Sequence, residues 1–160
     1  MKNEERPQHQ VTARSRTVAT TVLMVATFMD LMDSTITNVA LPTIGKDLNA
    51  TPEQLEWTLA GYVIAFATLL ITGGRLGDIF GHRRIFVIGM VGFTLASLGA
   101  ALSQTGDLLV ATRVIQGAFA GIMVPQVLSS VQVMFAPEER APVLGIIGAL
   151  SSLGAIGGLI

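Results

Sequence analysis

The sequence contains no cysteine and few charged residues, which make up 13% of its 160 residues. The missing cysteine excludes disulfides and thiol chemistry and leaves the redox compartment open. Soluble domains carry about twice this charged fraction, so water is a poor solvent for the folded chain. The formal net charge of -1 at pH 7 argues against nucleic acid as a partner.

Patterns typical of metal sites and enzymes are also missing. The two histidines, His9 and His82, have no ligand partners at metal spacing. The glycines between residues 73 and 81 are not followed by the Lys-Ser/Thr pair of a phosphate loop. No serine stands in a nucleophile-elbow pattern. The chain is therefore predicted to be no enzyme and to use no cofactor.

Hydrophobic residues make up 51% of the chain, and its mean hydropathy is +0.62. They gather in runs of about twenty residues, the length that crosses a bilayer. The predicted fold is an all-α membrane protein with a polar tail over 1–16 and a partial helical bundle over 17–160. The expected membrane helices cover residues 17–41, 57–76, 85–104, 108–135 and 142–160, the last one truncated. Because proline is costly inside a helix, Pro42 is expected to close the first helix and Pro125 to interrupt the fourth.

The positive charges orient these helices. Of ten Lys and Arg residues, eight fall in the tail or in the links after the second and fourth helices. Lys46 lies in the expected first outer loop, and Arg113 lies inside the fourth helix. By the positive-inside rule the N-terminus is cytoplasmic and the spans alternate. The tail could instead begin a cleaved signal peptide, but the next run lacks a clear cleavage site and contains acids.

A polar stretch of eleven residues, Gly74 to Arg84, separates the second and third helices and reads G-R-L-G-D-I-F-G-H-R-R. It is predicted to be a tight turn at the cytoplasmic surface. The simpler interpretation is a basic turn that only sets orientation.

This turn resembles the signature G-x-L-a-D-r-x-G-r-[KR]-[KR] of the major facilitator superfamily of secondary transporters. Ile79 and His82 stand where the family usually has arginine. The resemblance implies a cytoplasmic gating loop in which Asp78 latches the outward-facing state, through Arg84 or through the N-terminus of another helix. The residues of this loop are Gly74, Asp78, Gly81, Arg83 and Arg84.

Two further motifs resemble the drug:proton antiporter branch with fourteen helices. Residues 33–42, D-S-T-I-T-N-V-A-L-P, are similar to its first-helix motif, and Arg113, Gln116 and Gly117 match R-x-x-Q-G of its fourth helix. The resemblance implies proton-driven export of lipophilic or cationic compounds across the plasma membrane by alternating access. The helix-five motif G-P-x-x-G-G is incomplete. The chain is thus interpreted as an N-terminal piece whose missing C-terminal half is a partner, and it is expected to transport nothing alone.

Three ionisable residues lie inside the apolar runs, where charge is expensive and needs a reason. Asp30 and Asp33 are three positions apart and share a helix face. Two carboxylates in a poorly hydrated site cannot both ionise cheaply, so one of them can load and release a proton. Arg113 is predicted to pair with Asp33, and protonation or substrate binding is predicted to loosen the pair. A static ion pair serving assembly is the alternative.

The remaining cavity candidates have weaker support. Asp30 has no counterpart in the first-helix motif, and it could couple protons, line the cavity mouth or bind a cationic substrate. Gln116 and Asn38 are candidate hydrogen-bond partners in the cavity, although helix–helix contacts would explain them equally well.

Two other functions stay open: a facilitator that imports a metabolite, and a short membrane protein that moves no solute. The partners expected for the main interpretation are membrane lipid and a small-molecule substrate, with the proton gradient as the energy source. Seven to nine further spans after residue 160 would indicate a transporter (the arithmetic of twelve or fourteen helices minus five), and a stop codon at Ile160 would favour the non-transporting protein.

Overall fold

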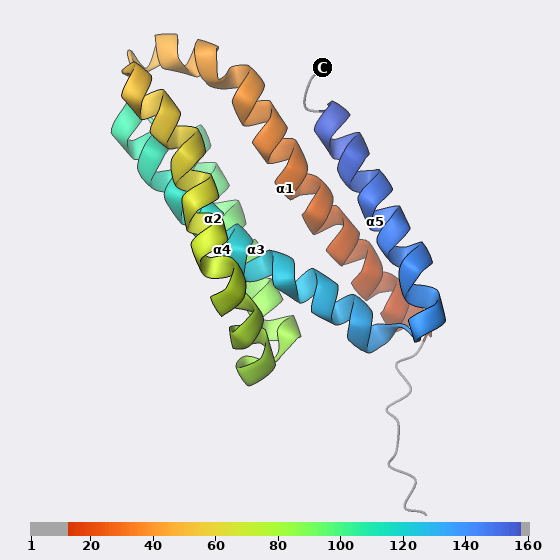
Figure 1. The fold of residues 1–160 in the computed structure, drawn as a ribbon. Helices are drawn as coiled ribbons and strands as arrows, with labels where there is room; N and C mark the ends of the chain where they lie inside the picture. The colour runs from red at the N-terminus through yellow and green to blue at the C-terminus, as the bar shows by residue number, and fades with distance from the viewer. Residues whose placement is uncertain (1–12, 158–160) are drawn as a thin grey trace, which may run out of the picture.

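The computed structural model describes residues 13–157, which form five helices and no strand (Figure 1). Residues 1–12, most of the predicted tail, and residues 158–160 lie outside the described part. The helices are α1 (Ala13–Asp47), α2 (Pro52–Phe80), α3 (His82–Ala101), α4 (Gly106–Met134) and α5 (Pro137–Gly157). The predicted all-α class is confirmed.

Four helical segments are long and apolar enough to cross a membrane: Thr20–Asp47, Pro52–Phe80, His82–Ala101 and Gly106–Met134. Their outward faces carry large apolar side chains, including Ile71, Leu95 and Val133, with exposures of 78%, 63% and 76%. A monomer rarely exposes so many large apolar side chains to water. Such a surface suits lipid, because a helix satisfies its backbone hydrogen bonds internally and can present apolar side chains to the hydrocarbon. The chain is a membrane protein.

The helices are longer than the predicted apolar runs. The apolar criterion marks only the part of a helix that lies in hydrocarbon, whereas helical hydrogen bonding continues into polar residues at the surface. The predicted turn over 74–84 is the clearest correction: α2 runs to Phe80 and α3 starts at His82, so only Gly81 separates them. Gly81 has φ 92, a conformation that side chains disfavour, and it ends α2.

Proline does not end or interrupt helices where the sequence analysis placed it. Pro42 lies inside α1, which continues to Asp47, and Pro125 lies inside α4. A proline removes one backbone donor and usually bends the helix that contains it. Figure 1 shows the last turns of α1 at an angle to its earlier part. Because α1 continues to Asp47 and α2 already starts at Pro52, the predicted outer loop over 42–56 is reduced to residues 48–51.

Two threonines, Thr51 and Thr105, cap the first turns of α2 and α4. Thr51 and Gln54 form a reciprocal capping box at the start of α2, with bonds of 3.2 and 2.9 Å, which satisfies two free donors of the first turn. Thr105 caps α4 through a bond of 3.3 Å from the Leu108 amide. Gln54 Nε2 also donates to Asp107 Oδ1 at 2.7 Å. The starts of α2 and α4 are therefore tied together.

α4 lies at the centre of the packing, with α2 and α3 against it, while α1 packs more extensively on α5 than on α4. Backbone contact with α2 depends on Gly117 and Gly121, because a Cβ there would lie 2.2 and 2.5 Å from the carbonyl oxygens of Tyr62 and Phe66. Small residues permit such approach between membrane helices. This contact places residue 62 beside the middle of α4.

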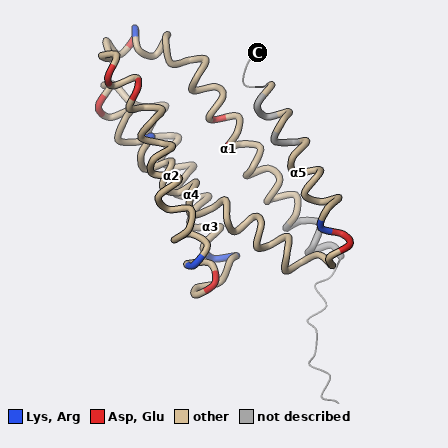
Figure 2. Tube along the Cα trace, in the orientation of Figure 1, with Lys and Arg blue, Asp and Glu red and all other residues tan. Residues whose placement is uncertain are grey.

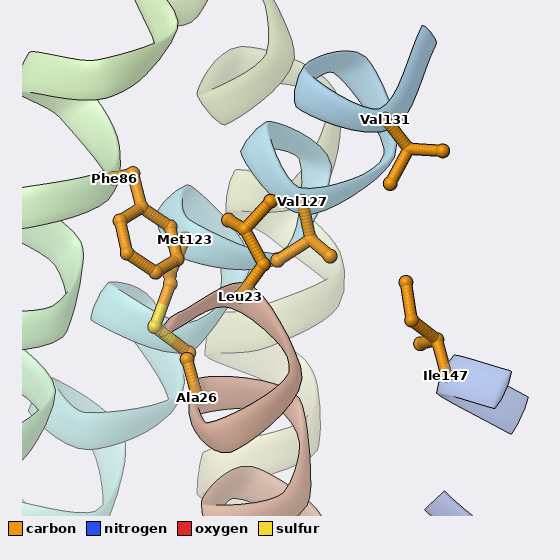
Figure 3. Packing of buried hydrophobic residues seen from close by; sticks show 7 residues of the cluster. All are labelled: Leu23, Ala26, Phe86, Met123, Val127, Val131 and Ile147. Carbon is orange, nitrogen blue, oxygen red and sulfur yellow. The ribbon is translucent and has the colours of Figure 1, made fainter. Parts of the chain in front are cut away.

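One apolar cluster joins four helices (Figure 3). Leu23 and Ala26 of α1 point toward Met123 and Val127 of α4, and Phe86 of α3 lies beside Met123. Val131 and Ile147 extend the cluster to α5. It anchors α1 to α4 on the side of the α2–α3 junction.

Charged residues gather near the helix ends. Figure 2 shows Lys and Arg where α2 meets α3 and at the start of α5, both at the lower end of the bundle. This is the distribution on which the predicted cytoplasmic N-terminus depends. The orientation itself stays a prediction.

Candidate functional site

The predicted ion pair between α1 and α4 is present. Arg113 Nη1 donates to Asp33 Oδ2 at 2.6 Å. Arg113 is 3% exposed, and the Asp33 side chain is 19% exposed. Both residues lie in membrane-spanning segments, where an unpaired charge would be expensive. The two charges therefore balance each other in a nearly closed environment.

Gln116 completes this pair. Its Nε2 donates to Asp33 Oδ1 at 2.8 Å, and its Oε1 accepts a bond of 2.7 Å from Arg113 Nη1. Gln116 is fully buried and lies three positions after Arg113, so both project from one face of α4. Each oxygen of Asp33 thus has a donor, and the three side chains form a closed triangle.

Tyr62 of α2 adds a second carboxyl group to the cluster. Its hydroxyl donates to Asp30 Oδ1 at 2.6 Å, and its ring centroid lies 4.5 Å from Cζ of Arg113. That separation is within the range of a cation–π contact. The sequence analysis did not single out Tyr62. Its signal was modest: it is the single tyrosine of the chain, and a buried hydroxyl in a membrane span needs a partner.

Asn38 does not join the cluster. Its side chain is exposed, and its Nδ2 donates to the Ser34 carbonyl of the same helix at 2.7 Å. Five positions along a helix correspond to a rotation of about 140° relative to Asp33, so the two side chains leave α1 on different faces. Of the five predicted cavity residues, the structure brings together Asp30, Asp33, Arg113 and Gln116.

One donor in the cluster is unused. Arg113 Nε is buried and has no hydrogen-bond partner among the described residues. A buried donor without a partner usually costs about 1–3 kcal/mol. An acceptor atom bound beside the guanidinium would recover that energy.

The predicted gating loop has a different arrangement from the expected one. Asp78 lies 3.5 Å from His82 Nε2, and among the described residues no ion pair joins Asp78 to Arg84, which is exposed. His82 begins α3 directly after Gly81, so it faces the last turn of α2 while Arg84 turns outward. Arg83 and Arg84 line a shallow groove with Phe80, Val87 and Ile88.

A buried glutamine at this junction was missed by the sequence analysis. Gln126 of α4 is fully buried, and its Nε2 donates to the carbonyl oxygens of Gly73 at 2.7 Å and Ile122 at 3.0 Å. Its Oε1 therefore faces His82 Nδ1 at 2.8 Å, and this ring nitrogen must carry the hydrogen. The bond links the start of α3 to α4.

The close packing of α2 on α4 at this junction requires glycine at positions 73 and 77. A Cβ on Gly73 would lie 2.6 Å from the Gly121 carbonyl oxygen, and one on Gly77 would overlap the Gln126 amide. At Gly74, which the motif includes, a Cβ would meet only Pro125 at an ordinary 3.8 Å. Which glycine faces α4 depends on the helix rotation, and the motif spacing alone does not reveal it.

Comparison with known proteins agrees with this architecture. A family model described as Major Facilitator Superfamily matches residues 23–160. A probable actinorhodin transporter of Streptomyces coelicolor is 43% identical over 88% of this chain and 24% of its own length. The puromycin resistance protein of Streptomyces alboniger is 40% identical over 87% and 28%, and a probable multidrug resistance protein of Escherichia coli is 37% identical over 79% and 25%. The chain spans about a quarter of the length of these relatives. Since the family model covers most of the chain, the chain belongs to the major facilitator superfamily.

Proposed function

We propose that this chain forms the N-terminal part of a proton-coupled antiporter that exports lipophilic or cationic drugs across the plasma membrane. The observation that carries the proposal is the buried triangle of Asp33, Arg113 and Gln116 inside two membrane spans. The relatives support the direction of transport, because their names describe resistance to antibiotics or their transport. The same names favour export over import of a metabolite.

The ion pair supplies a step that responds to protons. When Asp33 binds a proton, its charge disappears and its attraction to Arg113 falls. A substrate that competes for either partner has the same effect. The strength of the α1–α4 contact then depends on the occupancy of the site, which is what exchange of one ligand for another requires.

The packing allows this change to move a helix. α1 packs mainly on α5 and only lightly on α2 and α4, and Figure 1 shows α1 and α5 side by side. The triangle is therefore one of few links between the α1–α5 pair and the α2–α4 core. Releasing it lets the pair tilt, in the manner of alternating access around a fixed midplane site.

The proton gradient is the energy source in this proposal, and the chain itself binds no cofactor. Membrane lipid covers the outward faces. The C-terminal half of the antiporter supplies the second wall of the substrate path and a partner for the gating loop, in which Asp78 is exposed and available.

Replacing Asp33 with asparagine tests the proposal. In vesicles that contain the complete antiporter, drug-stimulated proton flux is expected to fall by about tenfold or more, because the site keeps its shape but loses its titratable charge. The control is Asp47→Asn, which changes an exposed acid at the end of α1 and should leave the flux at the wild-type value. Full proton-driven efflux by the Asp33→Asn variant would reject the coupling role.

A further inference from the structure

Tyr62 occupies the space between the two carboxyl groups of α1. Its hydroxyl binds Asp30 at 2.6 Å, while the face of its ring lies against Arg113, which holds Asp33. No direct bond joins Asp30 to Arg113 or to Asp33 among the described residues. Tyr62 is therefore the physical connection between Asp30 and the triangle.

The ring has little freedom to move. Gly117 brings α4 against the backbone at residue 62, and Phe66 stacks on the ring with 6.4 Å between centroids and 7° between planes. Phe93 and Ala120 pack against the same residue. A side chain that is held this tightly passes a change at its hydroxyl to whatever touches its ring.

Charge balance points to one exchangeable proton in this cluster. With both acids ionised, Asp30, Asp33 and Arg113 carry a net charge of -1, which is expensive inside a membrane span. One bound proton removes that charge. Asp33 already faces the guanidinium and the Gln116 amide, whereas Asp30 receives one neutral donor. While the Asp33–Arg113 pair is intact, Asp30 is therefore the position left for the proton, and Asp33 can take one only after the pair has loosened.

We propose that Tyr62 is a positioning residue that couples proton exchange at Asp30 to the contact between Arg113 and Asp33. This inference rests on the proposed function and adds a second carboxyl group to its mechanism. The phenol keeps its own proton throughout. Its oxygen donates to Asp30 when that acid is ionised, and it accepts from Asp30 when the acid is protonated. Each exchange reverses the hydrogen bond at the hydroxyl and so changes the charge distribution of the fixed ring that Arg113 contacts.

Few other charged groups can interfere. The charged groups that face Asp30 are Asp33 on its own helix and Arg113 on α4. On α2 the acids and bases lie toward the two ends of the helix, and on α5 they lie in its first turns. α4 carries only Asp107 and Arg113. A change of exchange rate with pH can therefore be assigned to the ionisable groups of this cluster.

The test compares Tyr62→Phe with wild type in the complete antiporter, by measuring drug–proton exchange in vesicles across a range of pH. The variant keeps the ring and loses the hydroxyl. Ionised Asp30 then loses its hydrogen-bond donor, which favours the protonated acid. The pH at which the exchange rate is half-maximal is therefore expected to rise by about one unit. Trp57→Phe, an exposed aromatic change on the same helix, should leave the midpoint unchanged.

A second comparison works even if Tyr62→Phe folds poorly. Asp30→Asn removes the exchanging acid while Tyr62 stays, and the pH profile should then become flat over the same range. Adding Tyr62→Phe to Asp30→Asn should produce no further change in the profile, because the hydroxyl has no titrating partner.

Two results would overturn the inference in distinguishable ways. If Tyr62→Phe exchanges with the wild-type midpoint while Asp33→Asn is inactive, the link through Tyr62 is wrong and the proposed function stands. If Asp33→Asn exchanges normally, the proposed function fails, and the inference fails with it.

Discussion

Replacing Arg113 with methionine in the complete protein is expected to abolish the proposed drug–proton exchange and to destabilise the protein by about 3–5 kcal/mol. Methionine has similar length but no charge and no donors. The change removes the bonds from Nη1 to Asp33 and Gln116 and the cation above the Tyr62 ring. Asp33 would remain as a largely buried carboxylate without a counter-charge, which is the source of the penalty.

Thermal unfolding in lipid nanodiscs measures this effect. Arg75→Met is the matched control, because it changes an exposed arginine of α2 and should cost little. The double variant Asp33→Asn with Arg113→Met should be more stable than Arg113→Met alone, since it removes the unpaired charge. Equal stability of Arg113→Met and Arg75→Met would mean that the buried pair contributes nothing, contrary to this expectation.

The ion pair could be predicted from the sequence for a simple reason. Asp33 and Arg113 are charged residues in apolar runs, and each needs a partner that the other can supply. Periodicity placed Asp30 beside Asp33, whereas Gln116 was only a candidate hydrogen-bond partner in the cavity and its contact with the pair was not predicted. The partner of Asp30 could not be predicted in this way, because Tyr62 looks like any other member of an apolar run until α2 is placed against α4.

The same limit explains why the motif did not identify the glycines of α2 that pack against α4. The family motif drew attention to Gly74 and Gly81, and Gly81 does end α2 through its positive φ. Gly73 and Gly77 face α4 instead, where Gln126 enters the space that a Cβ would fill. A sequence gives the spacing of glycines along a helix, whereas the rotation of that helix depends on its neighbours. Asn38 fell outside the site for the same reason.

Adding one methyl group at Gly117 is expected to destabilise the complete protein by about 3 kcal/mol or more. The Cβ of Gly117→Ala would lie 2.2 Å from the Tyr62 carbonyl oxygen and 2.9 Å from two further backbone atoms of residue 62. These are atoms of a helix, so no flexible side chain can move aside. α2 and α4 would have to separate by about 1 Å, which forfeits packing along their whole contact.

The separation also displaces the site, because Tyr62 and Arg113 come from the two helices that are pushed apart. Gly74→Ala is the matched control on the same interface, where the new Cβ meets only Pro125 at 3.8 Å. Its unfolding temperature should match or slightly exceed that of wild type, since alanine favours helix over glycine. Gly117→Ala should unfold well below both. If the two variants unfold at the same temperature, α2 and α4 do not pack backbone to backbone, and the position of Tyr62 between the carboxyl groups loses its structural basis.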